Sequence, residues 1–159
     1  TRVRSSAASD VYKRQEILAA FGEEAADRPV QWREGVKWMD RYKADVFLVT
    51  LNKSERRFSP TTRYRDYPIS PTLFHWESQS TTSTSSPTGQ RYIHHRERGT
   101  RVLFFVRESS VGDSIGASPF LFLGTASYIS HERDRPMAIT WRLDHEMPPD
   151  FFQMARAAV

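Results

Sequence analysis

Basic residues are concentrated in the middle of the sequence, where they alternate with Ser and Thr. Guanidinium and ammonium groups bind phosphate oxygens, and neighbouring hydroxyls and backbone amides can donate to the same oxygens. The segment therefore predicts contacts to the phosphates of a nucleic acid. The candidate phosphate-binding residues are Lys53, Arg56, Arg57, Arg63, Arg65 and Arg91.

Aromatic rings and polar groups follow directly in the sequence. A pocket for a base that has left the double helix needs ring faces for stacking and polar groups that read the Watson–Crick edge. The carboxylate of Asp66 or of Glu77 can accept a hydrogen bond from the N4 amino group of cytosine. The candidate pocket residues are Tyr64, Asp66, Tyr67, Phe74, Trp76, Ser78 and Gln79.

Several of these residues have a second interpretation. Residues 73–78 alternate like a half-buried strand, so Phe74 and Trp76 on one face can equally belong to the core. Asp66 can instead accept a hydrogen bond in a turn or pair with an arginine. An arginine in a polar loop can also simply be solvated, so the cluster is better evidence than any single member.

The distribution of charge favours one phosphate-facing side. Residues 53–107 contain ten basic and four acidic residues, a net charge of +6, whereas residues 16–51 and 108–159 carry −2 and −3. The overall charge of +4 is less informative, because residues 1–15 contribute +3 of it. A basic centre between acidic flanks indicates an anionic partner.

The competing hypothesis is that the chain is an enzyme, and its candidate catalytic residues are mainly histidines. His75 and Glu77 share a strand face, and His94 with His95 are candidate metal ligands or general bases. Adjacent histidines on an extended chain point in opposite directions, and His131 and His145 lie in predicted turns. The sequence contains no Cys and lacks the HExxH and Walker patterns. We therefore expect a non-catalytic domain without metal or cofactor, with a His-dependent nuclease as an alternative.

The elements that position these residues belong to an α+β domain. Strands are predicted at residues 45–51, 73–78, 101–107, 120–129 and 137–143, and helices at 16–26, 33–42 and 150–158. Residues 52–71 and 79–89 are predicted loops, and 131–136 a charged turn. We expect a curved, mostly antiparallel sheet or a small β-barrel, with helices before it and after it.

The sequence is expected to hold one domain. A chain of 159 residues suits a single core, and no apolar run is long enough to span a bilayer. Residues 1–15, TRVRSSAASDVYKRQ, resemble translated sequencing-adapter read-through, so we expect them to be foreign, and disordered or without function. The domain is then residues 16–159.

Several segments together resemble a known family. They are Leu51–Ser54, Phe58–Tyr67, Phe74–Gln79, Gly89–Ile93, Leu103–Glu108, Phe120–Gly124 and Arg135–Trp141. In this order they are similar to a C-terminal domain of unknown function that follows superfamily II helicase cores. The resemblance covers about residues 16–158.

The resemblance implies a bacterial, cytoplasmic DNA-processing protein. Its members often carry a phospholipase-D-like nuclease in modification-dependent restriction systems, and some relatives are similar to SRA or PUA domains. It thus implies partners, namely double-stranded DNA, methylated or not, and helicase and nuclease domains of the same parent chain. The expected function is recognition of 5-methylcytosine-like DNA by base flipping. The alternative is a structural module that packs on the helicase core.

Overall fold

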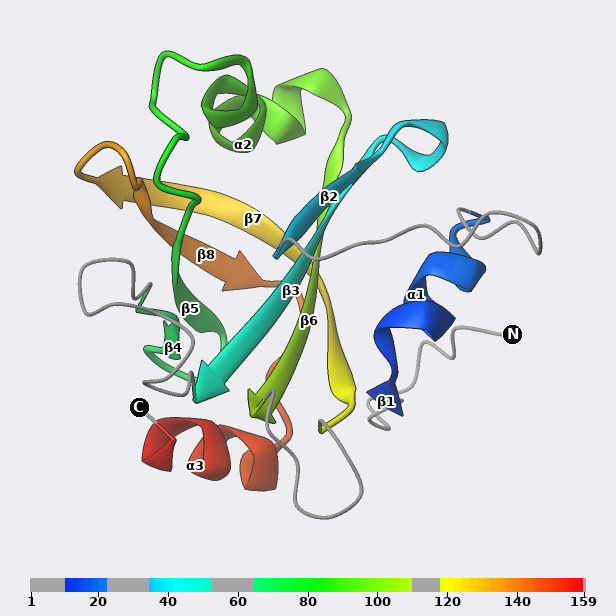
Figure 1. The fold of residues 1–159 in the computed structure, drawn as a ribbon. Helices are drawn as coiled ribbons and strands as arrows, with labels where there is room; N and C mark the ends of the chain where they lie inside the picture. Colours follow the sequence, from blue (N-terminus) through cyan, green and yellow to red (C-terminus); the bar gives the residue numbers. More distant parts are fainter. Residues whose placement is uncertain (1–10, 23–34, 53–64, 110–117, 159) are drawn as a thin grey trace.

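One sheet dominates the computed structural model, which describes residues 11–22, 35–52, 65–109 and 118–158 (Figure 1). The strands are β1 (Val11–Tyr12), β2 (Val36–Met39), β3 (Ala44–Asn52), β4 (Tyr67–Pro68), β5 (Leu73–Glu77), β6 (Arg101–Ser109), β7 (Phe120–Glu132) and β8 (Ala138–Leu143). The helices are α1 (Arg14–Ala20), α2 (Pro87–Arg98) and α3 (Pro149–Ala157), with a 3-10 turn, η1 (Asp40–Tyr42).

The strand order is β2-β3-β6-β7-β8-β5-β4, and β1 adds to β7. Every pair is antiparallel except β3 and β6, which run parallel with Phe47 opposite Phe104. Parallel neighbours need a long crossover, and here the connection carries β4, β5 and α2. The expectation of an α+β fold with a mostly antiparallel sheet is confirmed.

The sheet is strongly curved. Three strands separate β3 from β5 in the strand order, yet the rings of Phe47 and Trp76 stack with centroids 4.1 Å apart. The concave face therefore encloses a core of large side chains, including Phe104 and Trp141. We call the opposite side of the sheet the convex face.

The curved sheet does not close into a barrel, so the expectation of a small β-barrel is wrong. The sheet is open, with β2 at one edge and β4 at the other. β4 has only two residues, and Pro68 has no backbone N–H to donate to a further strand. This edge is therefore unsuited to pair with β2.

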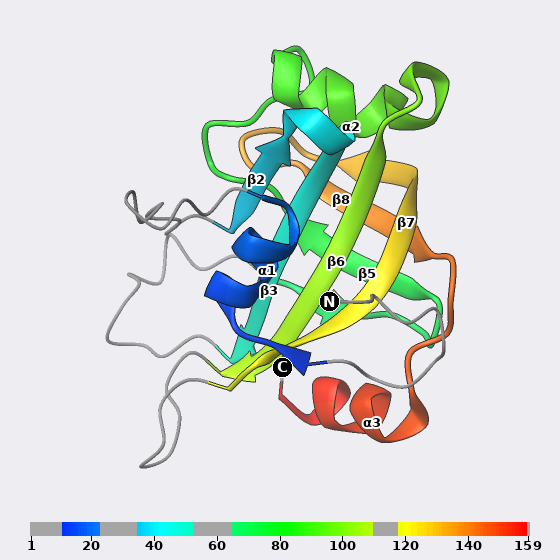
Figure 2. The same ribbon diagram turned by 90° about the vertical axis from the view of Figure 1, so that its right-hand side faces the viewer.

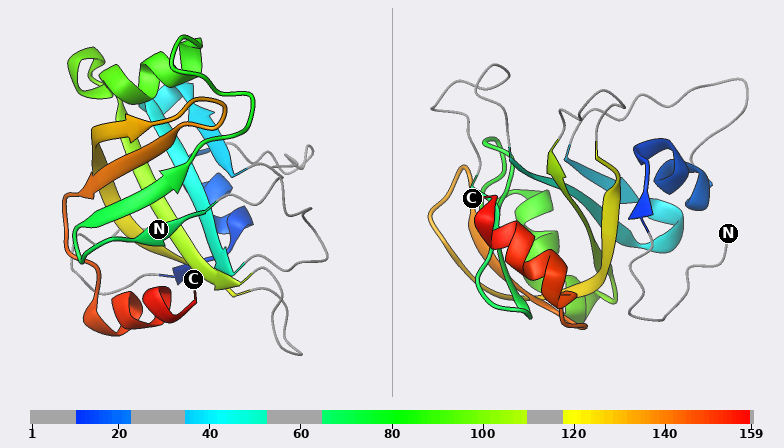
Figure 3. Two further views of the ribbon diagram at one scale, coloured as in Figure 1. Left: turned by 90° about the vertical axis from the view of Figure 1, so that its left-hand side faces the viewer. Right: turned by 90° about the horizontal axis from the view of Figure 1, so that it is seen from below.

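Helices cover three parts of the sheet. α2 and α3 lie at opposite ends of the curled sheet (Figures 1 and 2). α1 lies on the convex face, where Ile17 and Leu18 pack against Val46 and Phe105 from β3 and β6. The convex side of β8 and β5 has no described helix over it (Figure 3).

Most predicted elements are confirmed. The five predicted strands correspond to β3, β5, β6, β7 and β8, and the predicted C-terminal helix is α3. The first helix lies in the predicted place but ends at Ala20, because Gly22 adopts a left-handed φ of 68°. Its second half, from residue 23, lies outside the described residues.

The predicted helix at residues 33–42 is wrong. Residues 36–39 form β2, which pairs with β3, and a turn with Lys43 at φ 50° joins the two strands. Val36 and Trp38 favour a strand once β3 is available as a partner, so tertiary pairing outweighs the local helical spacing.

The predicted loop at residues 79–89 is too long, because its last three residues belong to α2. α2 starts at Pro87, directly after Ser86, whose side-chain oxygen accepts a hydrogen bond from the Gly89 N–H. Ser at the N-cap with Pro at the first helical position is a helix start signal. The Ser-rich composition of the preceding residues obscured it.

Two expectations concern the chain ends and membranes. The foreign origin of residues 1–15 stays a prediction, although Val11 and Tyr12 pair with Leu121 and Phe120 of β7.

In the part of the chain that the structure describes, no helix is long and apolar enough to cross a membrane.

Candidate nucleic-acid interface

The convex side of β5 and β8 carries the candidate interface. Phe74 and Trp141 point into the concave core, so the residues that alternate with them lie on the convex face. Across the two strands, His75 is opposite Thr140 and Leu73 is opposite Arg142. Arg142 is exposed and the other three are half-buried, so this face is polar and accessible.

An aromatic pair lies at the edge of this face. Tyr67 on β4 is opposite His75 on β5, and their rings stack with centroids 4.5 Å apart and planes 18° from parallel. Both side chains are half-buried. We call this pair the Tyr67–His75 stack. It presents ring surface of the kind on which nucleobases stack.

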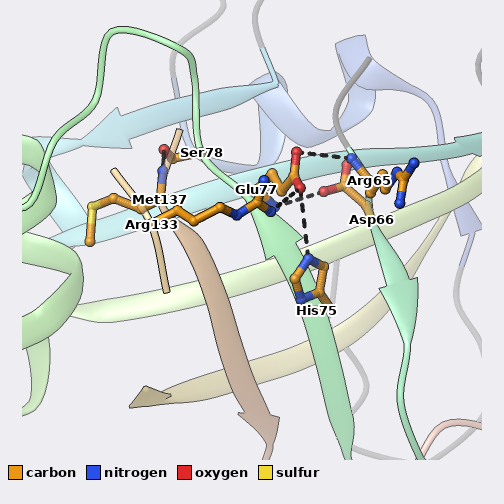
Figure 4. Close-up of polar contacts among 7 residues, drawn as sticks. All are labelled: Arg65, Asp66, His75, Glu77, Ser78, Arg133 and Met137. Carbon is orange, nitrogen blue, oxygen red and sulfur yellow. Dashed lines mark hydrogen bonds and ion pairs between the residues drawn. The ribbon is translucent and has the colours of Figure 1, made fainter. Parts of the chain in front are cut away.

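Two buried carboxylates organise the surroundings of the stack. Asp66 Oδ1 accepts a hydrogen bond from the Glu77 N–H at 2.9 Å, and Glu77 Oε2 accepts one from the Arg65 N–H at 3.2 Å (Figure 4). Asp66 and Glu77 are 6% and 7% exposed. Their contacts fix the chain at the start of β4 against the end of β5, and thus place Tyr67 beside His75.

Arg133 joins the same group from the turn between β7 and β8. Its Nη2 donates to Glu77 Oε1 at 2.8 Å, while most of its side chain is exposed. Arg65, also exposed, directs its guanidinium away from the carboxylates (Figure 4). Two arginines therefore flank the buried carboxylates, and both reach solvent.

The environment of His75 favours the neutral form of its ring at pH 7. Burial lowers the pKa of His75, and the negative charges of Glu77 and Asp66 oppose this only in part. Its Nε2 lies 3.9 Å from Glu77 Oε1. A neutral imidazole ring adds aromatic surface without adding charge.

Phe74 and Trp76 lie in the core. Their side chains are 0% and 4% exposed, and Trp76 packs flat on Phe47. The structure therefore places both where the alternative interpretation had them, away from the accessible side of the sheet.

Ser78 and Gln79 support the end of β5. The Ser78 hydroxyl accepts a hydrogen bond from the Met137 N–H at 2.9 Å and donates to the Gln79 carbonyl at 3.1 Å. Ser78 is fully buried and Gln79 is half-buried. The hydroxyl connects β5 to the residue before β8, so its hydrogen bonds are made within the protein.

Arg91 is held inside the fold. Its Nε and Nη2 donate to the two carboxylate oxygens of Asp45, each at 2.7 Å, and its guanidinium lies 4.5 Å from the ring centre of Trp38. Asp45 is completely buried. This bidentate pair ties α2 to β3 and leaves the guanidinium engaged within the protein.

The remaining predicted contacts lie outside the described residues. They are Lys53, Arg56, Arg57, Arg63 and Tyr64. In the sequence they directly precede Arg65.

Sequence reasoning missed Arg133 and the partnership of Tyr67 with His75. The only signal for Arg133 was the predicted charged turn at residues 131–136. In the structure β7 extends to Glu132, so the turn begins at Arg133, and two contacts fix it. Besides the Arg133–Glu77 pair, Asp134 Oδ1 accepts hydrogen bonds from the Thr84 N–H at 2.6 Å and from its hydroxyl at 3.1 Å. Both partners lie far away in the sequence.

His94, His95 and His131 make contacts within the protein. His95 Nε2 accepts a hydrogen bond from the Tyr128 N–H at 3.1 Å, and His131 Nδ1 lies 2.6 Å from the Tyr128 hydroxyl. His94 is 3.6 Å from Glu97. Among the residues that the structure describes, no three His, Asp or Glu side chains are grouped to hold a metal ion.

The chain matches the model of a known protein family. The model of a protein family described as "Domain of unknown function (DUF3427)" matches residues 8–155. No curated protein matches the chain.

Proposed function

We propose that this chain, which belongs to the family described as Domain of unknown function (DUF3427), is a non-catalytic DNA-binding module. It binds double-stranded DNA on the convex face of β4, β5 and β8, and it recognises 5-methylcytosine-like bases by flipping them, as an SRA-like or PUA-like reader. Its parent is a bacterial, cytoplasmic restriction or DNA-processing protein with helicase and nuclease domains.

One observation carries the proposal. The Tyr67–His75 stack lies on a sheet face that no described helix covers, and two exposed arginines flank the buried carboxylates beside it. Ring surface together with guanidinium groups is the combination that binds bases and backbone at once. In the sequence, the Arg-rich residues 53–64 directly precede Arg65.

The buried carboxylates hold the DNA-contacting residues in place before DNA binds. Glu77 fixes the backbone of Arg65 and the guanidinium of Arg133, so less conformational freedom is lost when DNA binds. In this scheme Arg65 and Arg133 contact phosphates, whereas a base stacks on Tyr67. Stacking of one base on an aromatic ring contributes about 1–3 kcal/mol.

The proposal leaves two alternative roles for Asp66 and Glu77, which are reading of the base and positioning of neighbouring residues. An ionised carboxylate has about four lone-pair sites, so a group that already accepts internal hydrogen bonds can accept another from a base amine. Alternatively, both act only as organisers of Arg65, Tyr67 and Arg133. Glu77→Gln separates the roles, because loss of base discrimination at unchanged overall affinity indicates base reading.

The test is binding of the chain to a plain duplex over a salt series. Phosphate contacts release counterions, so the affinity is expected to fall steeply as salt rises. Tight binding with a flat salt response would contradict the phosphate contacts, and absence of binding at low salt would contradict the function.

A second candidate is a module that packs on the helicase core of its parent. A cavity of about 410 Å³ between α1 and the convex face favours it, because its lining is mostly apolar. The lining includes Tyr12, Ile17, Phe21, Tyr42, Phe105 and Phe122. Packing alone predicts no affinity for DNA at low salt, so the same salt series separates the two functions.

The nuclease alternative is tested by cleavage. If the histidines are catalytic, the chain should cut DNA and require a divalent metal ion for it. The proposed module binds DNA and leaves it intact.

A further inference from the structure

A second basic region crosses the convex face near the C-terminal end of α2. Val102 is opposite Ala126, and both point into the concave core, so Arg101 and Ser127 are neighbours on the convex side. Ser127 is in turn opposite Arg142. Arg101, Ser127 and Arg142 thus form one row over three adjacent strands, which we call the Arg101–Arg142 row.

The row is accessible and adjoins a hollow. Both arginines are exposed, and Ser127 is half-buried. Arg101 and Ser127 line a mainly polar cavity of about 410 Å³, together with Arg96 from the last turn of α2. Neighbouring strands are about 4.8 Å apart, which separates the backbones of Arg101 and Arg142 by roughly 10 Å.

The charge of this region is positive. The cavity lining includes one carboxylate, Asp144, which accepts a hydrogen bond from the Thr125 hydroxyl. His95, which also lines the cavity, is buried, and burial lowers its pKa, so its neutral form is favoured at pH 7. The cavity lining therefore contains two arginines, Arg96 and Arg101, and one carboxylate, and Arg142 adds a third guanidinium group on the adjoining row.

The row continues the candidate interface. Arg142 is opposite Leu73, and two residues further along the same strands Thr140 is opposite His75 of the Tyr67–His75 stack. Both sets of side chains therefore lie on one convex face, two residues apart along β5 and β8. A ligand that runs across this face can touch both.

We propose that the Arg101–Arg142 row, with Arg96, binds phosphates of the same DNA that the Tyr67–His75 stack engages. This inference rests on the proposed function and extends it by a second set of backbone contacts. The hydroxyl of Ser127, between the two arginines, donates to the same phosphate oxygens. These contacts carry no base specificity and fix the orientation of the duplex on the sheet.

The test compares the salt dependence of duplex binding between the unaltered chain and an R101Q/R142Q variant. Each lost phosphate contact lowers the slope of log affinity against log salt by about 1, so the variant slope should be lower by about 2. R96Q alone should lower it by about 1. R101K/R142K keeps the charges and should keep the slope.

The matched control is R156Q, an exposed arginine on α3 at the other end of the sheet, which should leave affinity and slope unchanged. Thermal unfolding midpoints verify that each variant is folded. If R101Q/R142Q binds with the affinity and slope of the unaltered chain, the row is not a contact and the inference is wrong, while the proposed function stands. If the unaltered chain does not bind DNA, the proposed function fails and the inference fails with it.

Discussion

The guanidinium of Arg133 lies against the carboxylate of Glu77, with Nη2 2.8 Å from Oε1, although 56 positions separate the two residues in the sequence. This contact connects the β7–β8 turn to β5. The same carboxylate accepts the Arg65 N–H, so one buried group positions both arginines beside the Tyr67–His75 stack.

Glu77→Gln should destabilise the protein. The carboxylate is 7% exposed and accepts charge-assisted hydrogen bonds, each of which contributes about 1.5–3 kcal/mol. Replacement by the neutral amide should lower the free energy of unfolding in urea by about 1–3 kcal/mol. Glu132→Gln, an exposed glutamate on β7, is the control and should change it little. Equal stability of both variants would show that Glu77 does not organise this region.

Arg63→Ala together with Arg65→Ala should weaken binding to all duplexes alike. Phosphate contacts are independent of sequence, so plain and methylated DNA should lose the same factor, and the salt slope should fall by about 2. The measurement is fluorescence anisotropy with both duplexes over a salt series. A loss confined to methylated DNA would assign these arginines to base recognition instead.

Tyr67→Ala should mainly remove discrimination between modified and plain DNA. The substitution deletes the ring that stacks on His75, and with it about 1–3 kcal/mol of base stacking, or roughly 5- to 150-fold in affinity for the preferred duplex. Tyr67→Phe keeps the ring and should keep the preference. Equal losses on both duplexes from the Ala variant and from the arginine variant would contradict this division of roles.

The free energy of unfolding should fall as the pH drops from about 7.5 to 5. Burial lowers the pKa values of His75 and His95, so the folded protein binds protons less readily than the unfolded chain. Below the unfolded-state value of about 6.5, protonation favours unfolding, and above it the stabilisation is fully present.

Urea unfolding at several pH values in this window measures the effect. His95→Gln should flatten the pH dependence, whereas His145→Gln, at an exposed position, should leave it unchanged. A protein that becomes more stable towards pH 5 would contradict the burial of neutral histidines.

The sequence predicted elements well where the local pattern and the tertiary structure agree. Alternation in residues 73–78 placed Phe74 and Trp76 on one face, and the structure buries both. It failed at residues 33–42, where helical spacing of apolar residues coincides with a strand that exists because β3 lies beside it. A local pattern contains no information on such a partner.

The candidate site shows the same limit. Asp66, Tyr67 and Glu77 are close in sequence, so they could be proposed together, and the structure groups them. Arg91 looked equally suitable, but its partner Asp45 is 46 positions away and engages its guanidinium within the fold. Arg133 was missed for the same reason, since its place depends on Glu77. Ion pairs between distant residues decide which arginines remain available.

The most direct test of the central claim is a competition binding assay at two salt concentrations, with matched duplexes that contain cytosine or 5-methylcytosine. We predict salt-sensitive binding with a preference for the methylated duplex. Salt-sensitive binding without preference would contradict modified-base reading and leave a general DNA-binding module, and absence of binding to either duplex would contradict the account as a whole.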